Sequence, residues 1–376
     1  MARTRTQKKP KVCLVLQGGG ALGAYHIGAY QALEEAGYIP DWFAGISIGA
    51  LNSAILAGNK PEDRLEKLTE FWQRISRPET DVDLPLEMAP MFNMFSASQA
   101  LMIGQPDFFT PRLINPWLAL PGEAATSFYD TSPLFTTLNE LADFSLINQQ
   151  KARLTVGATC VTDGNLVFFD SQRQPLQAAH AVASGSLPPG FPATKIGEDY
   201  YWDGGCVSNS PINGILDLAE EDEDLLIFMV DLWNAKGELP QTMSEVLWRE
   251  KEIQYASRSC EHVEALVAKR NLDHIMGKSP EVVDSEQVPD VTSLKAGKKI
   301  DIVHITFNPL KGHIPLSDAE FSRRSIRLRR EAGYEDMVQA IQESPWTQRS
   351  AKLPAHFHRR HSHGSWIEEQ KIDKAS

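Results

Sequence analysis

The sequence predicts an α/β fold, in which helices pack on the faces of a mostly parallel sheet. The main observation is that two units of strand, glycine-containing turn and helix follow one another near the start of the chain. A second observation is size, because the 376 residues include 42% hydrophobic side chains. This is enough for one large domain with an extension, and it excludes a wholly disordered protein.

The two units share one pattern. The first begins with the apolar run 12–17, which has the length of a buried strand, and passes through a glycine-rich turn into a helix predicted at 22–36. Gly37 is placed to end that helix. The second unit has a strand at 41–46 and a helix of small residues at 48–56. Two such units in succession predict neighbouring parallel strands.

The middle of the chain contains further strand signals. Strands are expected at 154–162 and 166–169, with the turn signal Asp163-Gly164-Asn165 between them. Another strand is expected to end just before Asp203, and a buried strand is expected at 225–232.

Other segments differ in composition from this pattern. Residues 80–128 are rich in Met, Phe, Pro and Gly, and we expect an irregular insertion or lid there. Beyond residue 240, helical periodicity is found at 243–269, a strand is expected at 300–307, and an arginine-rich helix is expected at 317–334, ending at Gly333.

Charge, cysteine spacing and hydropathy exclude several classes of protein. The formal net charge of −12 argues against a nucleic-acid-binding protein. The four cysteines form no Cys-x-x-Cys pair, so neither a zinc ribbon nor a disulfide scaffold is indicated. No apolar run approaches the roughly 20 residues of a membrane span, and the N-terminal apolar run is too short for a signal peptide. We therefore expect a cytoplasmic protein, with peripheral membrane contact left open.

The first candidate motif is Gly45-Ile46-Ser47-Ile48-Gly49, which lies between a predicted strand and a predicted helix. Glycines two residues on either side of a serine allow a sharp turn that exposes the hydroxyl. The turn also places Ser47 near a helix N-terminus, which favours developing negative charge. A nucleophilic serine is one interpretation, and a tight packing turn with a helix-capping serine is the other.

The second candidate is the glycine-rich turn Gly18-Gly19-Gly20-Ala21-Leu22-Gly23. Successive glycines leave backbone N–H groups uncovered, and these can hold an oxyanion or a phosphate. The segment also matches the dinucleotide-binding pattern G-x-G-x-x-G. That pattern requires an acidic residue at the end of the second strand, whereas Asp41 precedes its strand.

The third candidate is Asp203-Gly204-Gly205, at the end of a predicted strand. Asp203 could act as a general base if its carboxylate reaches Ser47 and is desolvated enough to raise its pKa. The alternative is an ordinary turn with no catalytic role. A Ser-His-Asp triad is also open, with its histidine drawn from those after Asp203, including His262, His274, His304 and His313.

Three glycine-bearing turns, each after a strand, fit one pocket for acyl transfer. With these three turns in this order, the chain resembles the patatin-like phospholipases. The segments that carry the resemblance are Gly18–Gly23, Gly45–Gly49, Asp130–Leu134, Ala183–Pro192 and Asp203–Pro211.

The resemblance implies a three-layer α/β/α sandwich and a Ser–Asp dyad that needs no histidine. It implies that Ser47 is the nucleophile and Asp203 the base, with an oxyanion hole and no metal or cofactor. The oxyanion hole would be shaped by Gly18, Gly19 and Gly20, and the motifs would be supported by Gly45, Gly49, Gly204 and Gly205. The implied reaction is hydrolysis of lipid acyl esters, as in phospholipase A or a lysophospholipase.

Most members of the family carry Arg or Lys where this chain has Leu22. The oxyanion would then rest on backbone N–H groups and a helix dipole alone. The resemblance covers about 12–232, and the region after 240 resembles an extension found on some bacterial members. We therefore expect a flexible basic arm at 1–11, a catalytic domain at 12–232, a mainly helical C-terminal extension at 233–349 and a disordered tail at 350–376.

The expected partner is a lipid ester substrate, with contact to a lipid surface left open and no nucleic acid. Two other functions are considered. One is a nucleotide-binding oxidoreductase that uses the turn Gly18–Gly23, and the other is a non-catalytic lipid-binding protein. The sequence does not predict which lipid is cleaved or the oligomeric state.

Overall fold

The computed structural model describes residues 9–219, 223–256, 259–275, 299–309, 312–348 and 353–360. Its centre is a nine-stranded sheet with the strand order β11-β10-β9-β1-β2-β5-β8-β7, in which β6 also pairs with β5. The strands are β1 (Lys11–Leu16), β2 (Trp42–Ile46), β5 (Arg153–Cys160), β6 (Leu166–Asp170), β7 (Thr194–Ile196), β8 (Asp199–Asp203), β9 (Leu225–Asp231), β10 (Ile300–Thr306) and β11 (Ala355–Arg359).

The strands from β11 to β5 run parallel, and the antiparallel strands lie at the β5 side. The helices are α1 (Tyr25–Glu35), α2 (Ile48–Ala57), α3 (Arg64–Arg74), α4 (Ala89–Ile103), α5 (Ser132–Leu141), α6 (Phe144–Asn148), α7 (Ala178–Ser184), α8 (Ile212–Leu216), α9 (Met243–Ala256), α10 (Ser259–Ile275) and α11 (Arg323–Glu343). A separate two-stranded sheet joins β3 (Thr110–Pro111) to β4 (Tyr129–Asp130).

Alternating side chains of the parallel strands enter two apolar cores. In β1, Leu14 and Leu16 pack on the side that contains α1, α2 and α11, whereas Cys13 and Val15 pack on the side of α8 and α10. A strand buried on both faces explains why its sequence is continuously apolar. Helices on both faces of the sheet confirm the predicted α/β/α sandwich.

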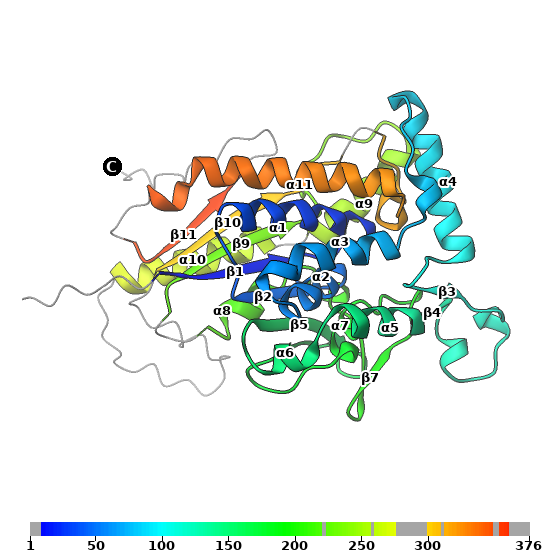
Figure 1. Ribbon diagram of the computed structural model, residues 1–376, viewed down its shortest axis with the longest axis horizontal. Helices are drawn as coiled ribbons and strands as arrows, with labels where there is room; N and C mark the ends of the chain where they lie inside the picture. The colour runs from blue at the N-terminus through cyan, green and yellow to red at the C-terminus, as the bar shows by residue number, and fades with distance from the viewer. Residues whose placement is uncertain are drawn as a thin grey trace, which may run out of the picture.

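The most extensive contact between two described helices joins α1, from the first part of the chain, to α11, from the last part. Helices α1 and α11 lie side by side (Figure 1). A Cβ atom added at Gly28 would lie 1.9 Å from the carbonyl oxygen of Arg330, and one added at Gly333 would lie 2.1 Å from that of Tyr25. Gly333 was expected to end its helix, but it lies inside α11, because it lets the two helix backbones approach closely.

The predicted boundary at residue 232 does not separate two sheets. The region after it contains α9, α10 and α11, as expected for a mainly helical extension, but it also contributes β10 and β11 to the central sheet. The expectation of a disordered tail at 350–376 is wrong for Ala355–Arg359, which form β11. Ala355 and Phe357 are buried against the α10 side of the sheet, which gives this polar segment enough apolar contact to pair with β10.

The basic arm expected at 1–11 lies largely outside the described residues, and Lys11 already belongs to β1. The insertion expected at 80–128 contains the 15-residue helix α4, which Figure 1 shows at one end of the molecule, with short turns and β3 after it.

Candidate active site

Ser47 lies at the turn between β2 and α2, as predicted. Its φ of 56° is in the left-handed region, which is strained for a residue with a side chain. A Cβ atom at Gly45 would lie 2.2 Å from the carbonyl oxygen of Gly49, and one at Gly49 would lie 2.1 Å from that of Leu16. The two glycines are therefore required for the tight turn that holds the serine between strand and helix.

The backbone at Ser47 is held by Ser184, at the end of α7. The Ser47 amide donates to the carbonyl oxygen of Ser184 at 3.1 Å and to its hydroxyl oxygen at 3.0 Å. The Ser184 hydroxyl in turn donates to the carbonyl of Gly157 at 2.6 Å. These bonds offset the strain of the turn, because Ser47 cannot leave its conformation without breaking them.

Asp203 is the last residue of β8, which lies antiparallel to β5. Its Oδ1 accepts a hydrogen bond from the Gly205 amide at 2.7 Å. Its Oδ2 is buried and accepts no hydrogen bond of ordinary geometry from any described residue. Burial raises the pKa of Asp203 to about 7, although the Ser47 hydroxyl and the Gly205 amide oppose the shift. The contact with Ser47 is a loose one, as is common for catalytic groups before substrate binds.

Ser47 and Asp203 line one cavity of about 290 Å³. Gly19 and Gly20 of the first turn line the same cavity, so the structure brings three of the predicted elements together. The remaining walls are mostly apolar, and their side chains come from α2, the end of α4, the segment that follows α4 and the loop after α7. They include Ile48, Leu51, Leu101, Phe108, Phe109, Tyr129, Leu187 and Phe191.

The three glycines predicted for the oxyanion hole have different roles. Gly18 does not line the cavity, and its amide donates to the carbonyl of Asn209 at 3.3 Å. Its carbonyl accepts from Asn209 Nδ2 and Trp233 Nε1, both at 2.9 Å. Among the described residues, the amides of Gly19 and Gly20 donate no hydrogen bond. Gly18 therefore anchors the turn, while Gly19 and Gly20 line the cavity.

The N-terminus of α2 adds a further source of positive potential beside Ser47. Ile48 is the first residue of this helix and lines the cavity. The first N–H groups of a helix have no partner within the helix, and the helix dipole is positive at this end.

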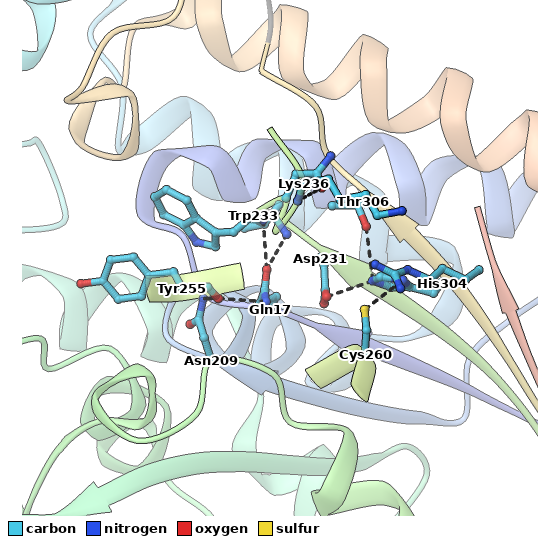
Figure 2. Close-up of polar contacts among 12 residues, drawn as sticks. Gln17, Asn209, Asp231, Trp233, Lys236, Tyr255, Cys260, His304 and Thr306 are labelled. Carbon is cyan, nitrogen blue, oxygen red and sulfur yellow. Dashed lines mark hydrogen bonds and ion pairs between the residues drawn. The ribbon is translucent and has the colours of Figure 1, made fainter. Parts of the chain in front are cut away.

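The region after residue 232 also forms part of the cavity, which sequence reasoning did not predict. Its contribution comes from five side chains on three separate segments, namely Trp233, Tyr255, Asp318, Ala319 and Phe321. Tyr255 is joined to the first region through its carbonyl, which accepts from Gln17 Nε2 and Asn209 Nδ2, each at 3.3 Å (Figure 2). The glycine-rich turn and the end of α9 are thus parts of one polar network.

Arg329 on α11 was also missed. Its buried guanidinium donates to the carbonyl of Ala21 at 2.9 Å, and to the carbonyls of Ser317 and Glu320 at 2.9 and 2.8 Å. Leu22 is itself buried in the apolar core. The chain therefore has no cation at position 22, but the cation of Arg329 binds the backbone of the same turn. No signal in the turn itself could reveal an arginine 308 positions away.

No described histidine lines the cavity. His304 instead pairs with Asp231, 2.9 Å away, and His313 packs against the ring of Trp248. The side chain of His274 lies outside what the structure describes. The Ser-His-Asp alternative therefore finds no histidine next to Ser47 in the described part of the chain.

The family models that match this chain cover the segments that contain these motifs. Residues 14–216 match a family model described as patatin-like phospholipase, and residues 253–353 match one described as patatin phospholipase. The first match spans more than half of the chain. The chain belongs to the patatin-like phospholipase family. The resemblance predicted from the sequence is confirmed.

Individual relatives match over short stretches. The mouse patatin-like phospholipase domain-containing protein 6 is 37% identical over 87 residues, which are 23% of this chain and 6% of the mouse protein. An uncharacterized NTE family protein of Mycobacterium tuberculosis is 43% identical over 74 residues, 19% of this chain and 12% of that protein. The matched stretch is thus a small part of each of these relatives.

Two solved structures share the general arrangement only loosely. VipD from Legionella pneumophila has a TM-score of 0.38 at 17% identity, with 89% of this chain and 67% of that chain covered. Human GIVD cytosolic phospholipase A2 has a TM-score of 0.35 at 12% identity, with 58% and 43% covered. The fold assigned to this patatin-like protein rests on its own strand order. Within the described residues, no helix is both long and apolar enough to span a bilayer.

Proposed function

We propose that this patatin-like protein is a serine hydrolase that cleaves carboxylic esters of lipids through Ser47 and Asp203. The observation that carries the proposal is that a strained serine and a buried carboxyl with a pKa of about 7 line the same apolar cavity. A carboxyl with this pKa is half ionised near neutral pH and can accept a proton from a serine far better than an ordinary aspartate can.

The reaction would begin when Asp203 accepts the proton of Ser47 as Oγ attacks the ester carbonyl carbon. The tetrahedral oxyanion would lie near the amides of Gly19 and Gly20 and the N-terminus of α2. Each lost oxyanion donor commonly costs roughly 3–4 kcal/mol of activation free energy.

Collapse of this intermediate breaks the bond to the alcohol oxygen, which takes the proton from Asp203 and leaves. An acyl ester on Ser47 remains. Water then attacks this ester while Asp203 accepts a proton from the water. The fatty acid is released, and the proton returns to Ser47. Asp203 acts as the base in both half-reactions, so this mechanism requires no histidine.

Contact with a lipid surface is part of this proposal. Large apolar side chains on α4 and the following segment are unusually exposed, among them Met91 (69%), Phe95 (67%), Met102 (76%), Trp117 (85%) and Leu118 (82%). Leu101 of the same helix lines the cavity. An exposed apolar surface of this kind typically marks a binding site, and its continuity with the cavity favours a lipid as the partner.

The vesicle test replaces Trp117 and Leu118 together by serine and measures sedimentation with phosphatidylcholine vesicles. We expect at least a tenfold loss of vesicle binding, because two large exposed side chains carry a few kcal/mol of burial free energy. The matched control is Leu239→Ser, which changes an 81% exposed leucine after β9. Equal binding of the double variant and the control contradicts the lipid-surface part of the proposal.

The catalytic proposal is tested by labelling the folded protein with a lipid-like fluorophosphonate and mapping the modified peptide. We expect labelling at Ser47, no labelling of Ser47→Ala, and full labelling of Ser145→Ala, which changes an exposed serine on α6. Mass spectrometry of a mixed lipid extract should show free fatty acids with wild type and not with Ser47→Ala. Vesicle binding without label or product would identify a non-catalytic lipid-binding protein. Saturable NAD(P) binding that Gly20→Val abolishes would favour the oxidoreductase.

A further inference from the structure

A second group of reactive side chains lies outside the cavity. Asp231 ends β9, His304 lies on the neighbouring strand β10, and Cys260 is in the first turn of α10. Figure 2 shows the three side chains pointing toward one another, and none of them lines the cavity of Ser47. The Cys260 sulfur, a ring nitrogen of His304 and a carboxylate oxygen of Asp231 all lie within 4.8 Å of one another. Nothing in the reaction proposed above uses them.

The three groups are arranged in line through the imidazole ring. The sulfur of Cys260 is 3.8 Å from Nδ1 of His304, and Nε2 of the same ring is 2.9 Å from Oδ2 of Asp231. Both ring nitrogens therefore already face a partner. This is the order of nucleophile, base and acid found where a histidine activates a thiol or hydroxyl.

The surroundings of His304 keep its ring charged. Burial alone would lower the pKa of His304, but Asp231 and Cys260 outweigh that effect and raise it to about 10. The other groups against the ring are neutral: the Thr306 hydroxyl is 3.3 Å from Nε2, and the Phe357 ring on β11 stacks at 5.7 Å.

The thiol is placed differently from its two partners. Asp231 and His304 are buried, whereas Cys260 is partly exposed. Cys260 is also the second residue of the 17-residue helix α10, where free N–H groups favour a negative charge. A neighbouring imidazolium and a helix N-terminus are the two features that commonly turn a cysteine into a thiolate.

We propose that Cys260, His304 and Asp231 form an activated-thiol site, at which Cys260 reacts as a thiolate with soft electrophiles. This site is independent of Ser47, and it is a site of covalent modification. With an alkyl iodide, the new S–C bond forms as the C–I bond breaks and iodide leaves. With a hydroperoxide, an S–O bond forms and the O–O bond breaks. The sulfur is oxidised to a sulfenic acid, which keeps the proton of the transferred oxygen. The peroxide is reduced, and the leaving oxygen takes its proton from His304 to become water or an alcohol.

The decisive measurement needs no variant, because the chain contains its own control. Cys206 is an exposed residue, and no histidine of the described residues bonds to its thiol. Partial desolvation of the thiol and the nearby Asp203 raise its pKa to about 11. The full-length protein is treated with iodoacetamide between pH 6 and 8, and labelling of each cysteine is followed by peptide mass spectrometry. Labelling of an ordinary thiol falls about tenfold per pH unit below its pKa. We expect labelling of Cys206 to increase about 100-fold over this range, and labelling of Cys260 to increase less steeply. An equal slope at both cysteines would falsify the proposal.

Variants separate this site from the hydrolase and from a metal site. Asp231→Asn keeps the shape of the carboxylate and should slow Cys260 labelling at pH 6 by about tenfold or more, because the imidazolium loses its counter-charge. Cys260→Ser should remove the label and leave fluorophosphonate labelling of Ser47 intact. The same Cys260 label should persist in Ser47→Ala. The competing outcome is stoichiometric zinc in the wild-type protein that blocks the alkylation of Cys260 and is lost in Asp231→Asn. That result would replace the activated thiol by a metal site.

Discussion

The region up to Leu232 and the region after it contribute to the cavity in different ways. The first supplies the candidate reacting groups, Ser47, Asp203 and the amides of Gly19 and Gly20. The second supplies apolar walls such as Phe321, together with the arginine that binds the glycine-rich turn from behind. Reactive groups need only a short turn to place them, whereas the shape of the cavity depends on residues far apart in the sequence. Changes in the first region should therefore abolish the reaction, and changes in the second should weaken it or the fold.

The largest effect is expected from Asp203→Asn. Removing the base should lower kcat by about 10⁴-fold, because the other carboxylate that lines the cavity, Asp318, is already paired with Lys251 at 2.7 Å. The same change should increase the free energy of unfolding at pH 8. An amide keeps the acceptor for Gly205 but need not be ionised in a buried position, and a pKa of about 7 in place of 3.8 corresponds to at most about 4 kcal/mol.

Kinetics and urea denaturation of the same variant check both expectations. If Asp203 has only a structural role, the variant should lose activity and stability together. An active Asp203→Asn enzyme would mean that the base lies elsewhere.

The pH dependence of the wild-type protein is the next test. Because burial raises the pKa of Asp203 to about 7, kcat/KM should be constant above about pH 8 and should fall tenfold per pH unit below 7. The free energy of unfolding should change in the opposite sense through this group. The folded protein binds the proton more tightly than the unfolded chain, so the contribution of Asp203 to stability falls as pH rises from about 4 to 7. An activity midpoint near 4 contradicts this assignment of the base.

In the second region, Arg329→Met should lower kcat by about 10- to 100-fold, since the carbonyl of Ala21 loses its donor and the amides that follow are less well fixed. The pH midpoint should stay where it is, because Asp203 is untouched. Arg327→Met is the matched control, since Arg327 lies on the same helix, is exposed and binds Asp83. If folded Arg329→Met has the wild-type kcat, the second region does not support the turn.

The smallest effect on activity is expected from Gly333→Ala. Its new methyl group would lie 2.1 Å from the carbonyl of Tyr25, so α1 and α11 must separate. The free energy of unfolding should fall by about 1–3 kcal/mol, with kcat nearly unchanged in the folded fraction. Glu331→Ala, on the exposed side of the same helix, provides the control. Equal stability of the two variants in guanidinium titrations would show that the helix contact tolerates a methyl group.

The comparison also explains what could be predicted from sequence. The turn at Ser47 and the aspartate at Asp203 are encoded locally, because small residues must flank a strained serine and a glycine pair must follow the strand. Gly333 was misread because a glycine that ends a helix and a glycine that lets two helices touch have the same local sequence. The partnership of Arg329 with Ala21, like that of Cys260 with His304, depends on tertiary packing and leaves no pattern in either segment.

β11 illustrates the same limit in a different way. Its sequence, Ala355–Arg359, alternates apolar and basic residues in a segment that is otherwise polar, and only pairing with β10 makes it a strand. The sequence could predict that the glycine-rich turn presents backbone amides. It could not predict the hydrogen bonds between Gly18 and Asn209.

Strand β9 has a consequence for how such a protein can be divided. It lies between β1 and β10 in the sheet, and its residues 225–231 fall between the two family matches at 14–216 and 253–353. A fragment that stopped after β9 would leave β9 as an unpaired edge strand. Its residues are apolar up to the last one, Asp231, and an exposed apolar edge strand promotes aggregation. We therefore expect that the region up to Leu232 does not fold by itself. Recombination or truncation at that position would have to provide a substitute strand before the region that contains Ser47 and Asp203 could fold by itself.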